Sequence, residues 1–180
     1  MTELAQVPFW FLRHGETDWN VQGLSQGRTD IPLNAAGQAQ ARAAAARLQG
    51  QGIRTIVSST LGRARETAAI VGAALGLPFS TDPDLQETFF GAQEGKKMGA
   101  WYDEWVEDRY TPAGGETFAA LRIRVVVGLN RALALPGPVL VIAHGAMFRA
   151  ARAEMGLSPH TRTENGIPIF CTPGSPWTFS

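Results

Sequence analysis

The chain has 180 residues, and its 16 lysines and arginines balance its 16 acidic residues. This length fits a single domain over residues 1–180, and the charge balance argues against a protein that binds nucleic acid or a membrane surface. Cys171 is the only cysteine in the sequence, so no intramolecular disulfide can form. No apolar run approaches the ~20 residues of a membrane span, and the first residues lack a signal-peptide pattern. We therefore expect a cytoplasmic protein.

Strand and helix patterns alternate in the first half of the chain. Short apolar runs predict strands, and alanine-rich stretches that end near a glycine predict helices. Residues 21–33 are polar and rich in Gly, Gln, Asp and Pro, which predicts a loop, and Asn34 is a candidate helix cap. The expected elements are a strand at 9–12, a helix at 35–49, a strand at 54–58, a helix at 61–75 and a strand at 79–81.

The second half continues this alternation. Its expected elements are a helix at 116–135, a strand at 139–143, a helix at 146–155, a strand at 167–171 and a tail at 172–180 with no assigned role. Such alternation predicts an α/β fold, a three-layer sandwich whose mostly parallel sheet is covered by helices on both faces.

A short insertion at about 94–115 interrupts the alternation. Trp101, Trp105 and Tyr110 lie there among charged residues, and the stretch ends in the sequence PAGG. We expect this cap to be partly helical and to lie over the sheet edge. Its tryptophans are expected to pack against other side chains rather than to form a platform for stacking bases.

Two histidines occupy similar places in the pattern. His14 and His144 each follow an apolar run closely and each precede a glycine. Ligands of open α/β sheets bind just beyond the carboxyl ends of the strands. We therefore expect both imidazoles to reach one crevice.

An arginine stands beside the first of these histidines. In the sequence RHGET at 13–17, Arg13 supplies an anion clamp next to the nucleophilic nitrogen of His14. The flanking cation disfavours the imidazolium and keeps the ring able to attack. Taken by itself, the Arg13–His14 pair is also consistent with a structural role, in which His14 only forms a hydrogen bond within a turn.

Two more arginines stand at the start of the helix that follows the second strand. Helix N-termini attract anions, and Arg63 and Arg65 add full positive charge there. Because residues two apart do not share a helical face, we expect one of these two arginines to face the crevice and the other to face solvent or a carboxylate.

Glu87 is the candidate acid. Apolar neighbours would favour its protonated form, which can donate a proton. Taken alone, Glu87 also fits a surface or helix-capping residue. Glu94 is a weaker candidate that is expected to pair with Lys96 or Lys97.

The sequence contains no pattern typical of a metal site. It has no His-Glu-x-x-His spacing and no cysteine cluster, and neither His14 nor His144 lies in a carboxylate-rich stretch. We therefore expect no metal site, and we expect His160 to lie in a surface loop.

These blocks, taken together and in this order, resemble the histidine phosphatase superfamily, in particular its phosphoglycerate mutase-like branch. The resemblance spans residues 9–149 and depends on five motifs. They are LRHGET at 12–17 with Asn20, the block at 58–67, LQE at 85–87 with Gly91 and the pair at 94–95, GGE at 114–116, and AHG at 143–145.

The resemblance implies a role for each matching residue. His14 would be the nucleophile that becomes phosphohistidine, and Arg13, Arg63 and His144 would surround the transferred phosphoryl group. Asn20 would be a further phosphate contact, and Glu87 the proton donor. No cofactor is implied, because the positively charged cage takes the place of a magnesium ion.

The function implied is a metal-independent phosphatase that acts on a small phosphorylated metabolite. A phosphoglycerate mutase is the alternative, and an inactive binding module on the same fold is a weaker one. The insertion is short and holds few basic residues, namely Lys96, Lys97 and Arg109, so transfer to water is favoured over transfer to a phosphoglycerate. The substrate and the oligomeric state stay open.

Overall fold

The computed structural model describes residues 2–180. Within these residues, six strands form one sheet in the order β3-β2-β4-β1-β5-β6. The strands are β1 (Phe9–Arg13), β2 (Thr55–Ser59), β3 (Phe79–Asp82), β4 (Val139–Ala143), β5 (Pro168–Thr172) and β6 (Thr178–Phe179).

The sheet is parallel at its centre. β1 and β2 both pair in parallel with β4, and β3 extends the parallel part beyond β2. β5 runs antiparallel to β1, and β6 runs antiparallel to β5. The expectation of a mostly parallel sheet is confirmed, and the tail at 172–180, which had no assigned element, supplies the edge strand β6.

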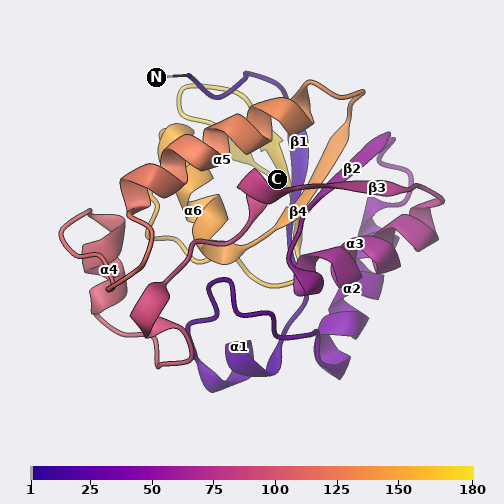
Figure 1. The fold of residues 1–180 in the computed structure, drawn as a ribbon. Coiled ribbons are helices and arrows are strands. Elements are labelled where there is room, and N and C mark those ends of the chain that lie inside the picture. The colour runs from indigo at the N-terminus through magenta and orange to yellow at the C-terminus, as the bar shows by residue number, and fades with distance from the viewer. Residues whose placement is uncertain (1) are drawn as a thin grey trace.

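Helices cover both faces of this sheet (Figure 1). Their bounds are α1 (Asp18–Gln22), α2 (Ala35–Leu48), α3 (Gly62–Leu75), α4 (Trp101–Val106), α5 (Phe118–Leu133) and α6 (Gly145–Glu154), with short 3₁₀ turns η1 (Pro83–Leu85) and η2 (Gly91–Gln93). Among residues 2–180, no helix is long and apolar enough to cross a membrane.

The strands divide the core into two hydrophobic layers. Along β1, Phe11 packs into the layer under α5 and α6, and its neighbour Leu12 packs into the layer under α2 and α3. Val141 and Ile142 on β4 divide in the same way. Because successive side chains of a strand point to opposite faces, two continuous apolar strands supply both layers, and the three-layer architecture follows.

Two helices begin differently from the expectation. The helix expected at 116–135 begins at Phe118, because the Thr117 side chain accepts a hydrogen bond from Ala120 N and caps it. A short helix, α1, was not expected, and Thr17 starts it with a capping box that includes Asn20. The cap expected at Asn34 is present, with its side chain accepting from Gly37 N at 2.8 Å.

The cap insertion contains α4 and an aromatic cluster. Trp105 is fully buried, its indole N–H donates to Glu116 O at 2.8 Å, and Phe90 packs edge-on against it. Trp101 and Tyr102 pack against the same Phe90 ring. The expected packing role of the tryptophans is confirmed, and the cluster fixes α4 beside the carboxyl ends of the strands.

The turn after β1 touches α2 backbone to backbone. A Cβ atom on Gly15 would lie 2.3 Å from Gly37 O, and one on Gly37 would lie 2.1 Å from Glu16 O. Two glycines therefore face each other where the His14 turn meets the first turn of α2, and neither side can yield without moving backbone.

We predict that Gly37→Ala destabilises the protein by about 1–3 kcal/mol, although alanine is the better helix former by ~1 kcal/mol. Gly99→Ala is the control, since the nearest atom to its Cβ lies at 3.6 Å. Urea unfolding of the two variants measures the difference. Equal midpoints would show that the Gly15–Gly37 approach is not tight.

Candidate active site

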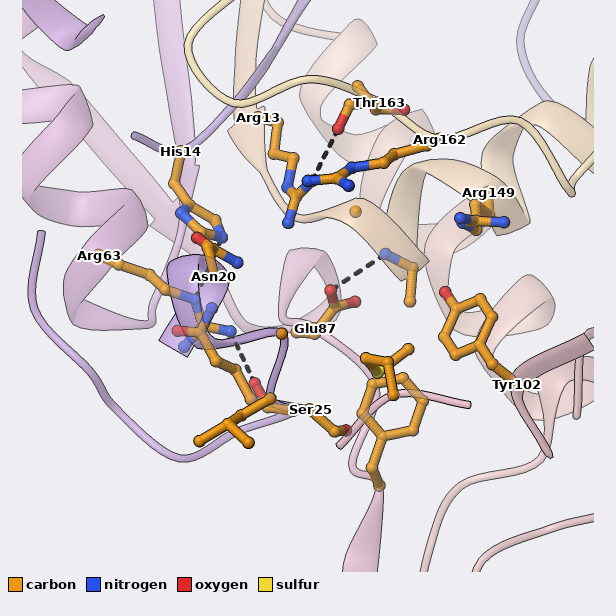
Figure 2. A pocket seen from close by; sticks show the side chains of 18 residues that line it. Arg13, His14, Asn20, Ser25, Arg63, Glu87, Tyr102, Arg149, Arg162 and Thr163 are labelled. Carbon is orange, nitrogen blue, oxygen red and sulfur yellow. Dashed lines mark hydrogen bonds between the residues drawn. The ribbon is translucent and has the colours of Figure 1, made fainter. Parts of the chain in front are cut away.

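A cavity of about 300 Å³ opens at the carboxyl ends of the parallel strands (Figure 2). Its wall includes Arg13 and His14 from the end of β1, Arg63 from the first turn of α3 after β2, and Glu87 from the loop after η1. His144 follows β4 and lies behind this wall, with its ring centroid 5.2 Å from that of His14. The structure thus brings together both histidines and both arginines that the sequence pattern placed at strand ends.

The hydrogen bonds of His14 define its tautomer. Nδ1 lies 2.7 Å from Gly15 O, and because a carbonyl oxygen only accepts, Nδ1 carries the proton. Nε2 then holds the lone pair and accepts from Arg63 Nε at 3.3 Å. Burial, and then the charges of Arg63 and Arg13, hold the pKa of His14 well below its usual value. The ring is therefore neutral, with a nucleophilic nitrogen on the side of the arginine.

His144 is fully buried, and its Nε2 lies 2.7 Å from Ser59 Oγ. Its Nδ1 has no hydrogen-bond partner within residues 2–180. Burial first, then Arg63 and His14, lower the pKa of His144 well below its usual value. Both imidazoles are therefore neutral in the unliganded site.

Arg63 is held by the loop between α1 and α2. It is 1% exposed, and beyond its bond to His14 it donates to Thr29 O at 3.0 Å and to Gly27 O at 2.6 Å. Arg65, two residues further, is exposed. The structure therefore places Arg63 at the cavity and Arg65 at the surface.

Arg13 lies in the opposite part of the wall. Its NH1 donates to Thr163 O at 2.7 Å, and its buried Nε has no partner within residues 2–180. Burial lowers the pKa of Arg13 to about 10, and the charge of Arg162 adds to the effect. Gly145 makes room for it, since a Cβ there would lie 3.3 Å from Arg13 Cζ.

Asn20 also lines the cavity. Its side-chain oxygen accepts from Thr17 N at 3.1 Å, and Asn165 approaches the same oxygen at 3.4 Å. Asn165 also donates to His14 O at 2.9 Å. The loop before β5 therefore fixes both Asn20 and the His14 backbone.

The expectation that Glu87 lies among apolar groups is wrong. Its Oε1 accepts from Thr88 N at 3.0 Å and from Met147 N at 2.9 Å, and its Oε2 accepts from Ala146 N at 3.0 Å. Glu87 thus caps α6, a helix distant in the sequence, while its side chain also forms part of the cavity wall. The helix-capping and proton-donor interpretations of Glu87 are therefore compatible, because the same carboxylate caps α6 and faces the cavity.

Arg124 on α5 holds the loop that carries Glu87. Its guanidinium donates to Asp84 O at 2.8 Å and to Gln86 O at 2.9 Å, and it pairs with Glu116 at 2.7 Å. The backbone of Glu87 therefore has a rigid anchor on the helix behind it.

Glu94 does not pair with Lys96 or Lys97. Its carboxylate accepts from Arg28 N at 2.9 Å, Thr29 N at 3.1 Å and Thr29 Oγ1 at 2.6 Å, and so fixes the loop that holds Arg63. His160 is a surface residue as expected, with Asp103 Oδ1 at 3.2 Å. No group of three or more His, Cys, Asp or Glu placed to hold a metal occurs among the described residues.

The cavity wall also contains residues that sequence reasoning missed, among them Tyr102, Arg149 and Arg162. Arg149 lies four residues after Gly145 in α6, so helical spacing from the His144 turn could have indicated it. Tyr102 and Arg162 lie in the cap and in the loop before β5, and no local pattern assigns either of them to a site.

A sequence model of the histidine phosphatase superfamily (branch 1) matches residues 9–167. A protein named probable phosphoglycerate mutase GpmB from Yersinia enterocolitica is 36% identical over 165 residues, covering 84% of this chain and 76% of that protein. An uncharacterized phosphatase PhoE from Bacillus subtilis is 38% identical over 146 residues, covering 80% and 75%. The structure of a mycobacterial glucosyl-3-phosphoglycerate phosphatase in complex with VO₃ superposes with a TM-score of 0.82 at 28% identity, covering 97% and 96%.

We predict that stability falls as the pH drops below about 6.5, because the unfolded chain then binds protons on His14 and His144 that the folded chain excludes. Each histidine contributes a slope of up to ~1.4 kcal/mol per pH unit. Urea unfolding between about pH 5.5 and 7.5, in buffer free of phosphate and sulfate, measures this slope. His14→Gln and His144→Gln should each reduce it, and an unchanged slope in both would contradict the neutral pair.

Proposed function

Because the chain belongs to the histidine phosphatase superfamily, we propose that it hydrolyses a small phosphomonoester through a phosphohistidine on Nε2 of His14, without a metal ion or cofactor. The hydrogen bond from His14 Nδ1 to Gly15 O carries this proposal, since it leaves the Nε2 lone pair on the side of Arg63. A neutral imidazole held in this way is a competent nucleophile.

In the first half-reaction, Nε2 attacks phosphorus and the bond from phosphorus to the ester oxygen breaks. Protonated Glu87 gives its proton to the departing oxygen. Oε1 of Glu87 accepts two backbone bonds and Oε2 accepts only one, so Oε2 has a lone pair free to carry that proton. Arg13 and Arg63, with Asn20 and His144, supply the donors that stabilise negative charge on the phosphoryl oxygens.

In the second half-reaction, water attacks the phosphohistidine. The Glu87 carboxylate takes a proton from this water, the bond from phosphorus to Nε2 breaks, and His14 returns to its neutral form. Once Nε2 carries the phosphoryl group, the Arg63 Nε–H that it accepted becomes free to bind a phosphoryl oxygen. Inorganic phosphate then leaves.

A mutase is the second candidate, since a relative carries the name probable phosphoglycerate mutase. Such an enzyme returns the phosphoryl group to a phosphoglycerate instead of water. The cap is short, with one six-residue helix at Trp101–Val106, so little covers a phosphohistidine against water. This favours the hydrolase. An inactive binding module is not favoured, because every candidate catalytic position is present, and the cytoplasmic location stays a prediction.

We expect the protein to hydrolyse p-nitrophenyl phosphate in the presence of a chelator. Arg63→Ala should lower kcat/KM by about 10²–10³, the usual loss for one preorganised donor, which is ~2.7–4 kcal/mol. Arg65→Ala is the matched control and should change it less than about twofold. Interconversion of phosphoglycerates by the wild type, without release of phosphate, would favour the mutase instead.

We expect the phosphoryl group to attach to residue 14. Brief mixing with a labelled ester and quenching in alkali, where phosphohistidine persists, should label the peptide that contains His14. His14→Ala should abolish the label, and His144→Ala should leave label that forms more slowly. Label on the His144 peptide would reverse the two roles.

We expect Glu87→Gln to impair esters with poor leaving groups far more than p-nitrophenyl phosphate, because a good leaving group needs little protonation. The measurement is kcat/KM across a series of phenyl and alkyl phosphates of rising leaving-group pKa. A uniform loss across the series would mean that Glu87 acts only through its cap on α6.

A further inference from the structure

The second histidine of the site is in contact with a buried hydroxyl group. Ser59 is the last residue of β2 and is fully buried, and its Oγ lies 2.7 Å from Nε2 of His144. The same Oγ accepts a hydrogen bond from Leu61 N at 3.2 Å, at the start of α3. One hydroxyl therefore joins the end of β2, the beginning of the helix that carries Arg63, and the ring of His144.

The contact between Ser59 and His144 allows two positions for the ring proton. The hydroxyl either donates to Nε2, which then holds a lone pair, or accepts from a protonated Nε2. Because the ring of His144 is neutral, its proton lies on Nδ1 in the first arrangement and on Nε2 in the second. The direction of this one hydrogen bond therefore sets the tautomer of His144.

The partners of each polar group distinguish the two tautomers. Among residues 2–180, Ser59 Oγ has hydrogen bonds only with Leu61 N and His144 Nε2, so its proton has an acceptor only at Nε2. If Nε2 donated, the buried hydroxyl proton and the buried lone pair of Nδ1 would both lack a partner. If Ser59 donates, only the Nδ1–H lacks one. An unpaired buried polar group costs free energy, so the count favours the Nδ1–H tautomer.

This tautomer gives His144 a donor that no protein group uses. Nδ1 is buried and has no hydrogen-bond partner among the described residues. The ring centroid of His144 lies 5.2 Å from that of His14, whose Nε2 is the proposed point of attack. With Nε2 of His144 engaged by Ser59, its Nδ1–H is the group available to an oxygen of a phosphoryl group bound at His14.

We propose that Ser59 is a positioning residue: its hydroxyl donates to Nε2 of His144, keeps the proton of that ring on Nδ1, and thereby makes a neutral His144 a hydrogen-bond donor to the phosphoryl group. The inference rests on the proposed function, which places that group on Nε2 of His14. The donor is formed before the substrate binds and needs no additional proton on the ring.

The two histidines then carry the same tautomer and present opposite groups to the site. At His14, the carbonyl oxygen of Gly15 accepts from Nδ1 and leaves a lone pair on Nε2. At His144, the hydroxyl of Ser59 donates to Nε2 and leaves a proton on Nδ1. A carbonyl oxygen only accepts, whereas a hydroxyl also donates. The partner of each ring therefore decides which histidine attacks and which one donates.

The tautomer can be measured without any turnover. The chain has three histidines, so two-bond ¹H–¹⁵N spectra of protein labelled at histidine resolve each ring and show which nitrogen carries the proton. At neutral pH we expect Nδ1–H at His144, assigned with His144→Gln, and a saturable shift of this resonance with inorganic phosphate. An Nε2–H form of His144, or no response of its Nδ1–H to phosphate, would overturn the proposal.

Ser59→Ala removes the donor, and Ser58→Ala is the matched control. Ser58 is also fully buried, and its hydroxyl donates to Ser59 O at 2.9 Å instead of to a histidine. In Ser59→Ala both ring nitrogens of His144 lack a partner, so the preference for Nδ1–H is lost and the Nε2–H form should appear. Ser58→Ala should keep Nδ1–H. An unchanged tautomer in Ser59→Ala would show that Ser59 does not set it, and the wild-type spectra remain decisive where this variant does not fold.

A double-mutant cycle shows whether Ser59 acts through His144. Ser59→Ala should lower kcat/KM for p-nitrophenyl phosphate about tenfold or more, the loss expected for one hydrogen bond to a charged group, and Ser58→Ala less than about twofold. In a His144→Ala background, Ser59→Ala should cause no further loss. The same loss in both backgrounds would assign Ser59 a structural role through Leu61 and contradict the inference.

The spectra also separate this inference from the proposed function. Suppose that the wild type does not hydrolyse p-nitrophenyl phosphate, yet His144 carries an Nδ1–H that responds to phosphate and is lost in Ser59→Ala. The role of Ser59 is then supported and the phosphatase reaction is wrong. If the wild type hydrolyses the ester and His144 carries its proton on Nε2, the role of Ser59 alone is wrong.

Discussion

The hydrogen bond from His14 Nδ1 to Gly15 O is the constraint from which the rest of the site follows. It fixes the tautomer, aims Nε2 toward Arg63, and requires the turn after β1 to keep one shape. That shape depends on the contact of Gly15 with Gly37, so the helix α2 contributes to the orientation of the imidazole without touching it. The His14 imidazole, the proposed nucleophile, is thus oriented by backbone groups, which have fewer ways to relax than side chains.

Buried positive charge is the main electrostatic cost of this fold. Arg63 is buried and Arg13 is half-buried, and both donate hydrogen bonds to backbone carbonyls, those of Thr163, Thr29 and Gly27, in place of carboxylates. Carbonyl dipoles stabilise a guanidinium without neutralising it, so the full charge stays available to an anion. The two histidines are neutral and leave this positive charge unchanged, so the pocket favours an anion over a neutral ligand.

The sequence was sufficient for the parts of the site that follow strand ends. His14, His144 and Arg63 could be placed together because parallel strands bring their carboxyl ends to one edge of the sheet. Arg162 and Tyr102 could not, because the path of a loop and the packing of a six-residue helix depend on contacts far away in the chain. Glu87 lies between these two cases. The sequence indicated it as a site residue, but its amide partners Ala146 and Met147 depend on how α6 packs against the sheet, which the sequence does not show.

The antiparallel strand β5 brings the loop at 163–165 back to the end of β1. Thr163 O binds Arg13 across 150 residues of chain, and Asn165 binds His14 O across 151. Contacts this distant carry a loop-closure entropy that the rest of the fold must offset. The last two strands are therefore part of the active site in a structural sense, because the site loses one wall wherever they are undocked.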